Sequence, residues 1–175
     1  MILNSDLILK HPLWARVDME LCSNKELGIF NRIIDVYVIA CAIGIKEDKV
    51  VNEGDEGEII RTIGRNTYMS MSNTDLKMIL DFLLQNAILH SKHLKYDMDE
   101  RLKLAFNPDY TIPKLSAASF LNAFANYGIE KIFENINSKS PLVVISDLNT
   151  YFDSLSSNNL SDLLGNIMLE EIGNS

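Results

Sequence analysis

The residues of this sequence that could do chemistry are few. His90 and His93 lie three apart, and Asp97 and Asp99 follow within a few positions. Imidazole and carboxylate groups are common ligands of divalent metals. Two lysines stand in the same stretch, however, and their ammonium groups oppose a bound cation, whereas Lys and His are favoured at the negative end of a helix dipole. We therefore interpret the stretch as a solvated helix end and expect no metal.

Other catalytic patterns are missing from the sequence. Cys22, Cys41 and His11 stand in no motif typical of a nucleophile or its base. Gly54 and Gly57 are flanked by acidic residues, and no Gly-Lys-Ser/Thr follows them, so a phosphate-binding loop is not indicated. With no motif whose context could support a reaction, we expect a protein that is not an enzyme and holds no cofactor.

Four basic side chains in the middle third are candidates for contacts with nucleic acid: Arg61, Arg65, Lys92 and Lys95. The formal net charge of the chain is −8, which argues against a general binder of polyanions, since such proteins carry a basic face. These residues therefore predict at most a local patch on DNA phosphates, and solvated surface charge is the simpler interpretation.

The clearest amphipathic helix is expected over residues 116–137. Asn122, Asn126, Glu130 and Glu134 recur every four residues, which predicts one wet face opposite a buried one. Gly128 interrupts this helix at a cost of about 1 kcal/mol relative to Ala, so another group is expected to approach closely there. A second helix of the same domain is the first interpretation. A partner protein is the second, and it makes Asn122, Asn126, Gly128 and Glu130 the predicted contact surface.

Helical periodicity dominates the rest of the chain. Apolar stripes predict a central helix over 25–44, with Gly44 as its left-handed stop, and a second helix from a cap at 73–75 to Ile88. Glycine and asparagine break residues 46–72 into an irregular segment or small hairpin. Further helices are expected over 96–107, over 142–154 after the Ser140-Pro141 start signal, and over 160–172.

Together these elements predict a mainly α protein, a single compact domain of about six helices spanning 1–175 with an acidic C-terminal part over 141–175. The chain has 175 residues, 47% of them apolar, enough for a hydrophobic core. Two cysteines are too few for a disulfide framework, which favours a reducing cytoplasm. We see no signal peptide and no apolar run long enough to cross a membrane.

Two segments resemble a known family. Ala40-Cys41-Ala42-Ile43-Gly44-Ile45-Lys46, at the end of an apolar helix, resembles the Ala-x-Gly-x-Lys turn of small proteins associated with bacterial DNA phosphorothioation (Dnd-type) defence loci. Phe124-Ala125-Asn126-Tyr127-Gly128-Ile129-Glu130 is similar to that family's Tyr-Ala-Asn-Gly-Gly-Leu segment, with Tyr127 in place of a glycine. The likeness covers about residues 27 to 155. It implies a helical accessory protein and transfers no catalytic residue.

The leading functional hypothesis is thus a non-catalytic accessory subunit of a multi-protein antiviral defence complex, acting against phage or foreign DNA by binding a larger ATPase or nuclease. One alternative is a DNA-binding regulator that uses the local basic patch. A second alternative is a cryptic metal-dependent nuclease built from His93, Asp97 and Asp99.

Overall fold

A computed structural model shows that the chain is mainly helical, as the sequence predicts. It describes residues 1–22, 29–52, 57–70, 74–113, 115–136 and 142–154. Where a single domain was expected, contacts divide the chain into two compact units, Met1–Phe133 and Glu134–Ser175. In the second unit residues 142–154 are helical, as predicted. The Ser140-Pro141 start signal and the helix expected over 160–172 lie outside the described residues.

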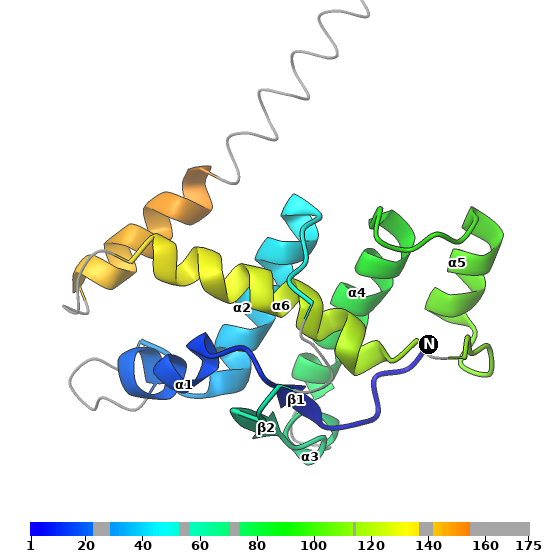
Figure 1. Cartoon of the computed structure of the whole chain (residues 1–175), viewed down its shortest axis with the longest axis horizontal. Coiled ribbons are helices and arrows are strands. Elements are labelled where there is room, and N and C mark those ends of the chain that lie inside the picture. The colour runs from blue at the N-terminus through cyan, green and yellow to red at the C-terminus, as the bar shows by residue number, and fades with distance from the viewer. Residues whose placement is uncertain (23–28, 53–56, 71–73, 114, 137–141, 155–175) are drawn as a thin grey trace, which may run out of the picture. The chain divides into compact units, whose positions relative to one another are not determined.

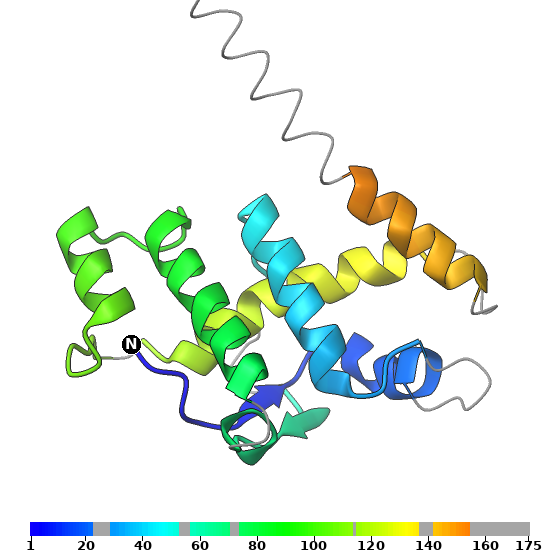
Figure 2. The ribbon, with the colours of Figure 1, turned by 180° about the vertical axis from the view of Figure 1, so that it is seen from behind.

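The first unit contains a two-stranded sheet and a set of helices. In chain order its elements are β1 (Leu7–Leu9), α1 (Leu13–Val17), the π-helix η1 (Asp18–Cys22), α2 (Ile33–Glu47), β2 (Arg61–Ile63), α3 (Asn66–Met69), α4 (Thr74–His90), α5 (Met98–Phe106) and α6 (Ala117–Glu134). Helices α2, α4 and α5 lie side by side, and α6 runs across them (Figures 1 and 2). Among the described residues, no helix combines the length and apolar character needed to cross a membrane.

The sheet joins distant parts of the chain. β1 pairs with β2 in antiparallel register, with Leu7 opposite Ile63 and Leu9 opposite Arg61. Leu7 and Leu9 are fully buried while Ile8 between them is exposed, because successive side chains of a strand point to opposite faces. The segment expected to be irregular or a small hairpin is irregular over most of its described length. Its one strand pairs with the N-terminus and not within the segment.

Helix α2 begins and ends later than the sequence indicates. The first described residues of the apolar stripe are not helical, since the N–H groups of Ile29 and Phe30 both bond the carbonyl of Leu21. The backbone of Arg32 is extended, so the helix begins after it. Gly44 is not the stop: it lies inside the helix, and Asp48 adopts the left-handed conformation with φ 50°. The spacing of the apolar residues alone therefore did not show where the loop ends and the helix begins.

Helix α6 is buried on nearly every side, contrary to the amphipathic interpretation. Its residues from Leu121 to Ile129 are all buried, and Asn122 and Asn126 are only 7% and 1% exposed. The four-residue repeat of polar residues therefore does not mark a wet face. It marks a polar seam inside the first unit, whose partners are described next.

Candidate functional site

The polar seam of α6 begins at Asn122, which binds two different elements. Its Oδ1 accepts a hydrogen bond from the hydroxyl of Tyr37 on α2 at 2.9 Å, and its Nδ2 donates to the carbonyl of Ile8 on β1 at 2.7 Å. A buried carboxamide that satisfies a buried hydroxyl and a strand carbonyl fixes the orientation of both. Asn122 thus positions β1 and α2 against α6.

One helical turn further, Asn126 makes an equivalent pair of bonds. Its Oδ1 accepts from the indole Nε1–H of Trp14 on α1 at 2.9 Å, and its Nδ2 donates to the carbonyl of Val51 at 3.3 Å. The N–H of Val51 in turn donates to the carbonyl of Ala123 at 2.8 Å. The side chain of Asn126 and the backbone of Ala123 therefore hold α1 and the chain after α2.

The seam ends at a half-buried ionisable pair. The Nε2 of His11 lies 3.0 Å from Oε1 of Glu130, and the His11 side chain is only 15% exposed. The predicted partner-contact residues are thus placed inside the first unit. Asn122, Asn126 and Gly128 are buried, so they do not form an exposed helix face of the kind predicted, and Glu130 is bonded to His11. That part of the prediction is corrected, because the polar repeat serves internal hydrogen bonds.

Gly128 lies at a close crossing of α6 with α2. A Cβ added at Gly128 would come within 1.9 Å of the carbonyl oxygen of Ala40, and one added at Gly44 would come within 2.3 Å of the carbonyl oxygen of Phe124. The two glycines therefore act reciprocally, each giving room to the backbone of the other helix. The first interpretation of Gly128, a helix crossing within the domain, is the one that the structure shows.

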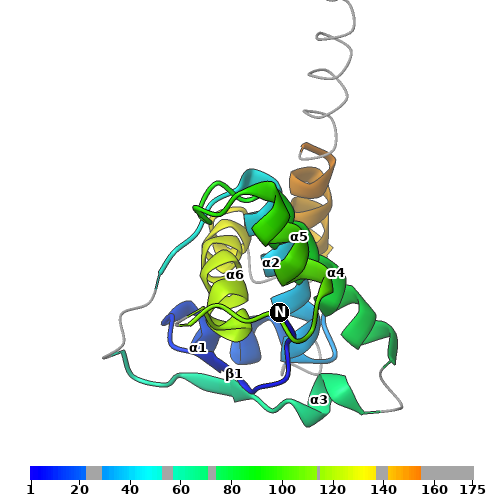
Figure 3. The ribbon, with the colours of Figure 1, turned by 90° about the vertical axis from the view of Figure 1, so that its right-hand side faces the viewer.

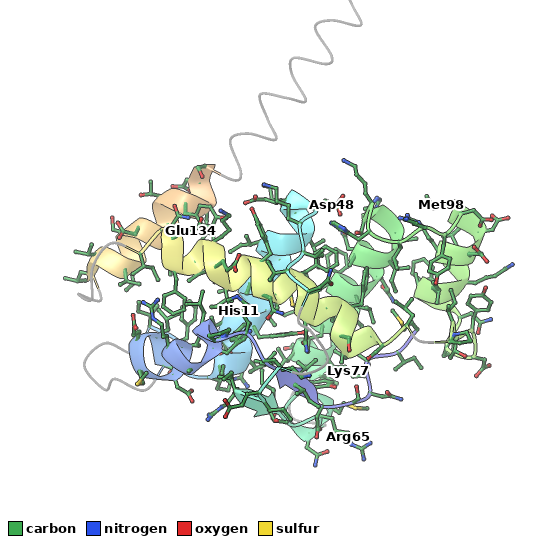
Figure 4. The ribbon with its side chains drawn as sticks, viewed as in Figure 1. His11, Asp48, Arg65, Lys77, Met98 and Glu134 are labelled. Carbon is green, nitrogen blue, oxygen red and sulfur yellow. The ribbon has the colours of Figure 1, made fainter. Side chains whose placement is uncertain are left out.

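A groove runs beside the seam. It has a volume of about 450 Å³ and lies between β1 and the first half of α6. Figure 3 shows β1 below α6, and Figure 4 places His11 beside the same helix. Hydroxyl and carboxamide groups make up most of the lining: Ser5, Asp6, Ile8, Lys10, Asn52, Ser116, Ala118, Ser119, Asn122, Ala123 and Asn126.

The four candidate nucleic-acid contacts do not converge. Arg61 pairs with Asp18 at 2.9 Å, and Arg65 lies next to α3, near the start of α4. Lys92 and Lys95 follow the end of α4, where the N–H of Lys92 bonds the carboxylate of Asp48. Figure 4 shows Asp48 at the top and Arg65 at the bottom, on opposite sides of the unit. A helix of 17 residues is about 25 Å long, so the two basic pairs form no single patch.

Arg101, another cation of the middle third, is used structurally. Its guanidinium group donates to the carbonyls of Ile88, Leu89 and Ser91, and also to those of Leu94 and Tyr96. A planar fork with five donors can satisfy several acceptors at once. The carbonyls of Ile88 and Leu89 belong to the last turn of α4, which has no helical partners for them, and the other three belong to the chain between α4 and α5. Arg101 therefore joins the start of α5 to the end of α4.

The proposed metal ligands serve other purposes. Asp97 caps α5 by accepting the N–H of Glu100, and Nε2 of His93 lies 3.0 Å from the carbonyl oxygen of Asp48. Within the described residues, no group of three His, Cys, Asp or Glu side chains lies close enough to hold a metal ion. This part of the chain thus offers no support for the nuclease alternative, whose ligands would have been His93, Asp97 and Asp99.

Both cysteine thiols are weakly acidic. Burial raises the pKa of Cys41 to about 12, and burial followed by the charge of Asp18 raises the pKa of Cys22 to about 11. Since the thiolate is the nucleophile, both groups are protonated and unreactive near neutral pH. Their environment is typical of packing residues.

We expect Cys22 to react with iodoacetamide about 100-fold more slowly at pH 8 than an unperturbed thiol, because a pKa raised from 9.0 to about 11 lowers the thiolate fraction by that factor. Raising the pH toward 11 should restore the rate. Mass spectrometry of the alkylated, folded protein measures it, and unfolding in urea provides the matched control. Equal rates in folded and unfolded protein at pH 8 would contradict this environment for Cys22.

A surface that the sequence reasoning missed lies on α4 and α5. Ile79 was assigned to a buried face but is 45% exposed. Its neighbours Met78 and Phe82 are 68% and 62% exposed, and Phe106 on α5 is 60% exposed. We call the following residues the α4–α5 apolar surface: Met78, Ile79, Phe82, Met98, Leu102 and Phe106. The signal was present in the sequence, since Met98, Leu102 and Phe106 recur every four residues on a helix whose other side carries Leu104 and Ala105.

The fold and the site define a small, mainly helical protein with an internal polar seam, a polar groove and an exposed apolar surface. Comparison with known proteins gave no match, whether to a family model, to a curated protein or to a solved structure. The function of the protein must therefore be inferred from the surfaces of the chain itself.

Proposed function

We propose that this protein is a non-catalytic subunit that docks onto a larger protein through the α4–α5 apolar surface. The observation that carries the proposal is the exposure of six large apolar side chains on two neighbouring helices. Phe82 and Phe106 alone leave roughly 200 Å² of aromatic surface in water, since a phenylalanine can bury about 150–250 Å². Exposed apolar patches of a few hundred Å² commonly mark interaction sites.

The two helices form a shallow receptor for another helix. They are antiparallel, because Arg101 near the start of α5 bonds carbonyls at the end of α4, while Phe106 shares a groove with Lys77 near the start of α4. This groove has a volume of about 260 Å³ and is mixed in character, since Lys77, Asp81 and Gln85 line it together with Ile2 and Phe106. An amphipathic helix binds by laying its apolar face on apolar side chains of its receptor, and the α4–α5 apolar surface beside this groove supplies such side chains. Met78 and Met98 add flexible side chains that adapt to the occupant.

The partner that we propose is an amphipathic helix of a larger ATPase or nuclease subunit in a bacterial defence complex. The resemblance of two segments to Dnd-associated proteins supports this choice, and so does the absence of a catalytic pattern in the sequence. Nothing in the arrangement of Arg61, Arg65, Lys92 and Lys95 favours direct DNA binding, because these residues lie in two separate pairs.

The experiment compares affinity-tagged wild-type protein with Phe82→Glu after purification from native extract. Phe82 is exposed, so the change should leave the free energy of unfolding within about 0.5 kcal/mol. We expect wild type to co-elute with ATP hydrolysis or DNA cleavage activity, and Phe82→Glu to lose at least nine-tenths of it. The matched control is Ser119→Arg, which adds a charged side chain at an exposed site away from this surface and should retain the activity.

Three results would overturn the proposal. The wild-type protein could elute without either activity, Phe82→Glu could retain the activity, or the purified chain could form a dimer that Phe82→Glu dissociates. The last result, measured by sedimentation, would make a second copy of this chain the occupant of the surface. Unchanged phage plating after removal of the gene would count against a defence role while leaving the docking surface intact.

A further inference from the structure

The groove beside the polar seam has a shape that suits an extended chain. One wall is the chain from Ser5 to Lys10, which contains β1 and spans at most about 16 Å at roughly 3.3 Å per residue. The other wall runs from Ser116, just before α6, to Asn126 on α6, which spans about 15 Å at roughly 1.5 Å per residue. The walls match in length, and that length equals four or five residues of an extended peptide.

The chemistry of the lining suits a peptide backbone better than an aromatic ligand or a charged ligand. Among the described residues, no aromatic side chain lines the groove, and Ile8 is the largest apolar residue of the lining. Asp6 and Lys10 contribute opposite charges, so the described part of the lining has no net charge to attract a polyanion. Most of the remaining groups are neutral donors and acceptors, such as Ser116 and Ser119. Groups of this kind pair with amide N–H and C=O groups.

The two buried carboxamides supply donors at the right interval. Each Nδ2 carries two protons, and within the described residues each has one acceptor, the carbonyl of Ile8 for Asn122 and that of Val51 for Asn126. One donor therefore remains on each side chain. Four residues of helix separate these side chains by about 6 Å, close to the roughly 6.6 Å between alternate carbonyls of an extended strand.

One strand edge next to the groove is open as well. Within the described residues the sheet has two strands, so β1 pairs with β2 on one edge alone. Addition of an extended peptide next to an exposed strand is a recurring mode of recognition, in which main-chain bonds provide affinity. Here the bonds would come chiefly from the carboxamides of α6, since Asn122 already bonds the carbonyl of Ile8.

We propose that this groove binds an extended peptide segment of four or five residues with small, polar side chains, held by its main-chain carbonyls on Asn122 and Asn126. The groove shares no residue with the α4–α5 apolar surface. The proposal is therefore independent of the proposed function, and either can fail without the other.

The test uses the full-length chain labelled with ¹⁵N and the capped peptide acetyl-Ser-Ala-Ser-Ala-Ser-amide. We expect saturable shifts in the side-chain amide signals of Asn122 and Asn126 and in the backbone signals of Ser119 and Ala123. Ser119→Arg places a long side chain in the groove and should weaken binding at least tenfold. Phe82→Glu is the matched control and should bind the peptide like wild type.

The folded state of Ser119→Arg is checked by its urea unfolding midpoint, and Ser116→Arg replaces it if that variant is unfolded. The proposal is overturned if the peptide causes no shift at millimolar concentration, or if both arginine variants bind it like wild type. It is also overturned if inorganic phosphate or acetyl-serine-amide produces the same shifts with equal affinity. Those two results would assign the groove to a small anion or to a single residue.

Discussion

Replacing Gly128 with alanine should destabilise the protein by about 3 kcal/mol or more, at the upper end of the cost of overpacking. The added methyl group would stand 1.9 Å from the carbonyl oxygen of Ala40, and the obstacle is helix backbone, which has no alternative rotamer. Helices α2 and α6 would have to separate, and the bonds of Asn122 to Tyr37 and of Asn126 to the chain after α2 would lengthen with them. Urea unfolding followed by circular dichroism measures the loss.

Gly64→Ala is the matched control for this change. A Cβ at Gly64 meets no atom within 4 Å, and its φ is not positive. We therefore expect an unchanged protein or one stabilised by about 0.4–1 kcal/mol through a less flexible unfolded chain. Gly44→Ala should behave like Gly128→Ala, and the double variant should lose less than the two losses added, because one separation of the helices relieves both clashes. Equal stability of Gly128→Ala and Gly64→Ala would refute the close crossing.

The second large effect is expected for Asn126→Leu, which keeps the size of the side chain and removes its hydrogen bonds. The indole N–H of Trp14 and the carbonyl of Val51 would both lose their partner, and each buried unsatisfied group costs about 1–3 kcal/mol. We expect a total loss of about 3 kcal/mol in the free energy of unfolding. Chemical denaturation monitored by Trp14 fluorescence would report it, since the chain has a single tryptophan.

A double-mutant cycle with Trp14→Phe separates the indole bond from the rest of this loss, and all four proteins are compared by circular dichroism because Trp14→Phe removes the only tryptophan. Phenylalanine has no N–H to leave unpaired, so Asn126→Leu should cost less in the Trp14→Phe background than in wild type, with a coupling of about 1 kcal/mol or more. Asn86→Leu, at a half-exposed position of α4, should stay within about 0.5 kcal/mol of wild type. A coupling near zero would show that the Trp14–Asn126 bond contributes nothing to stability.

Local patterns were sufficient to predict the helical class and the positions of α4 and α5. The cap before α4, its regular apolar stripe and the prolines after α5 are all local signals, and helix formation depends on local spacing. The boundaries of α2 were less accurate. Its apolar stripe continues through Ile29 and Phe30, which are buried by a loop contact and not by a helix.

The polar seam could not be predicted from the sequence, for a physical reason. A polar residue at every fourth position of a helix predicts a solvent-exposed face unless buried partners are known for these residues. Here the partners come from β1, α1 and α2, which are far from α6 in the sequence. The same argument applies to Phe82. Its position on α4 suits a buried or an exposed face, and the structure leaves it 62% exposed. Gly128 was the one site residue for which the sequence indicated the correct contact.

The bond between Trp14 and Asn126 also has a consequence for biosynthesis, since 112 residues separate its two partners. A ribosome adds roughly 5–20 residues per second, so about 6 to 20 s pass between the appearance of this tryptophan and that of its acceptor. During that interval the nascent N-terminal part lacks α6, and its apolar side chains are open to chaperones. Completion of the fold must wait for translation of the last third of the gene.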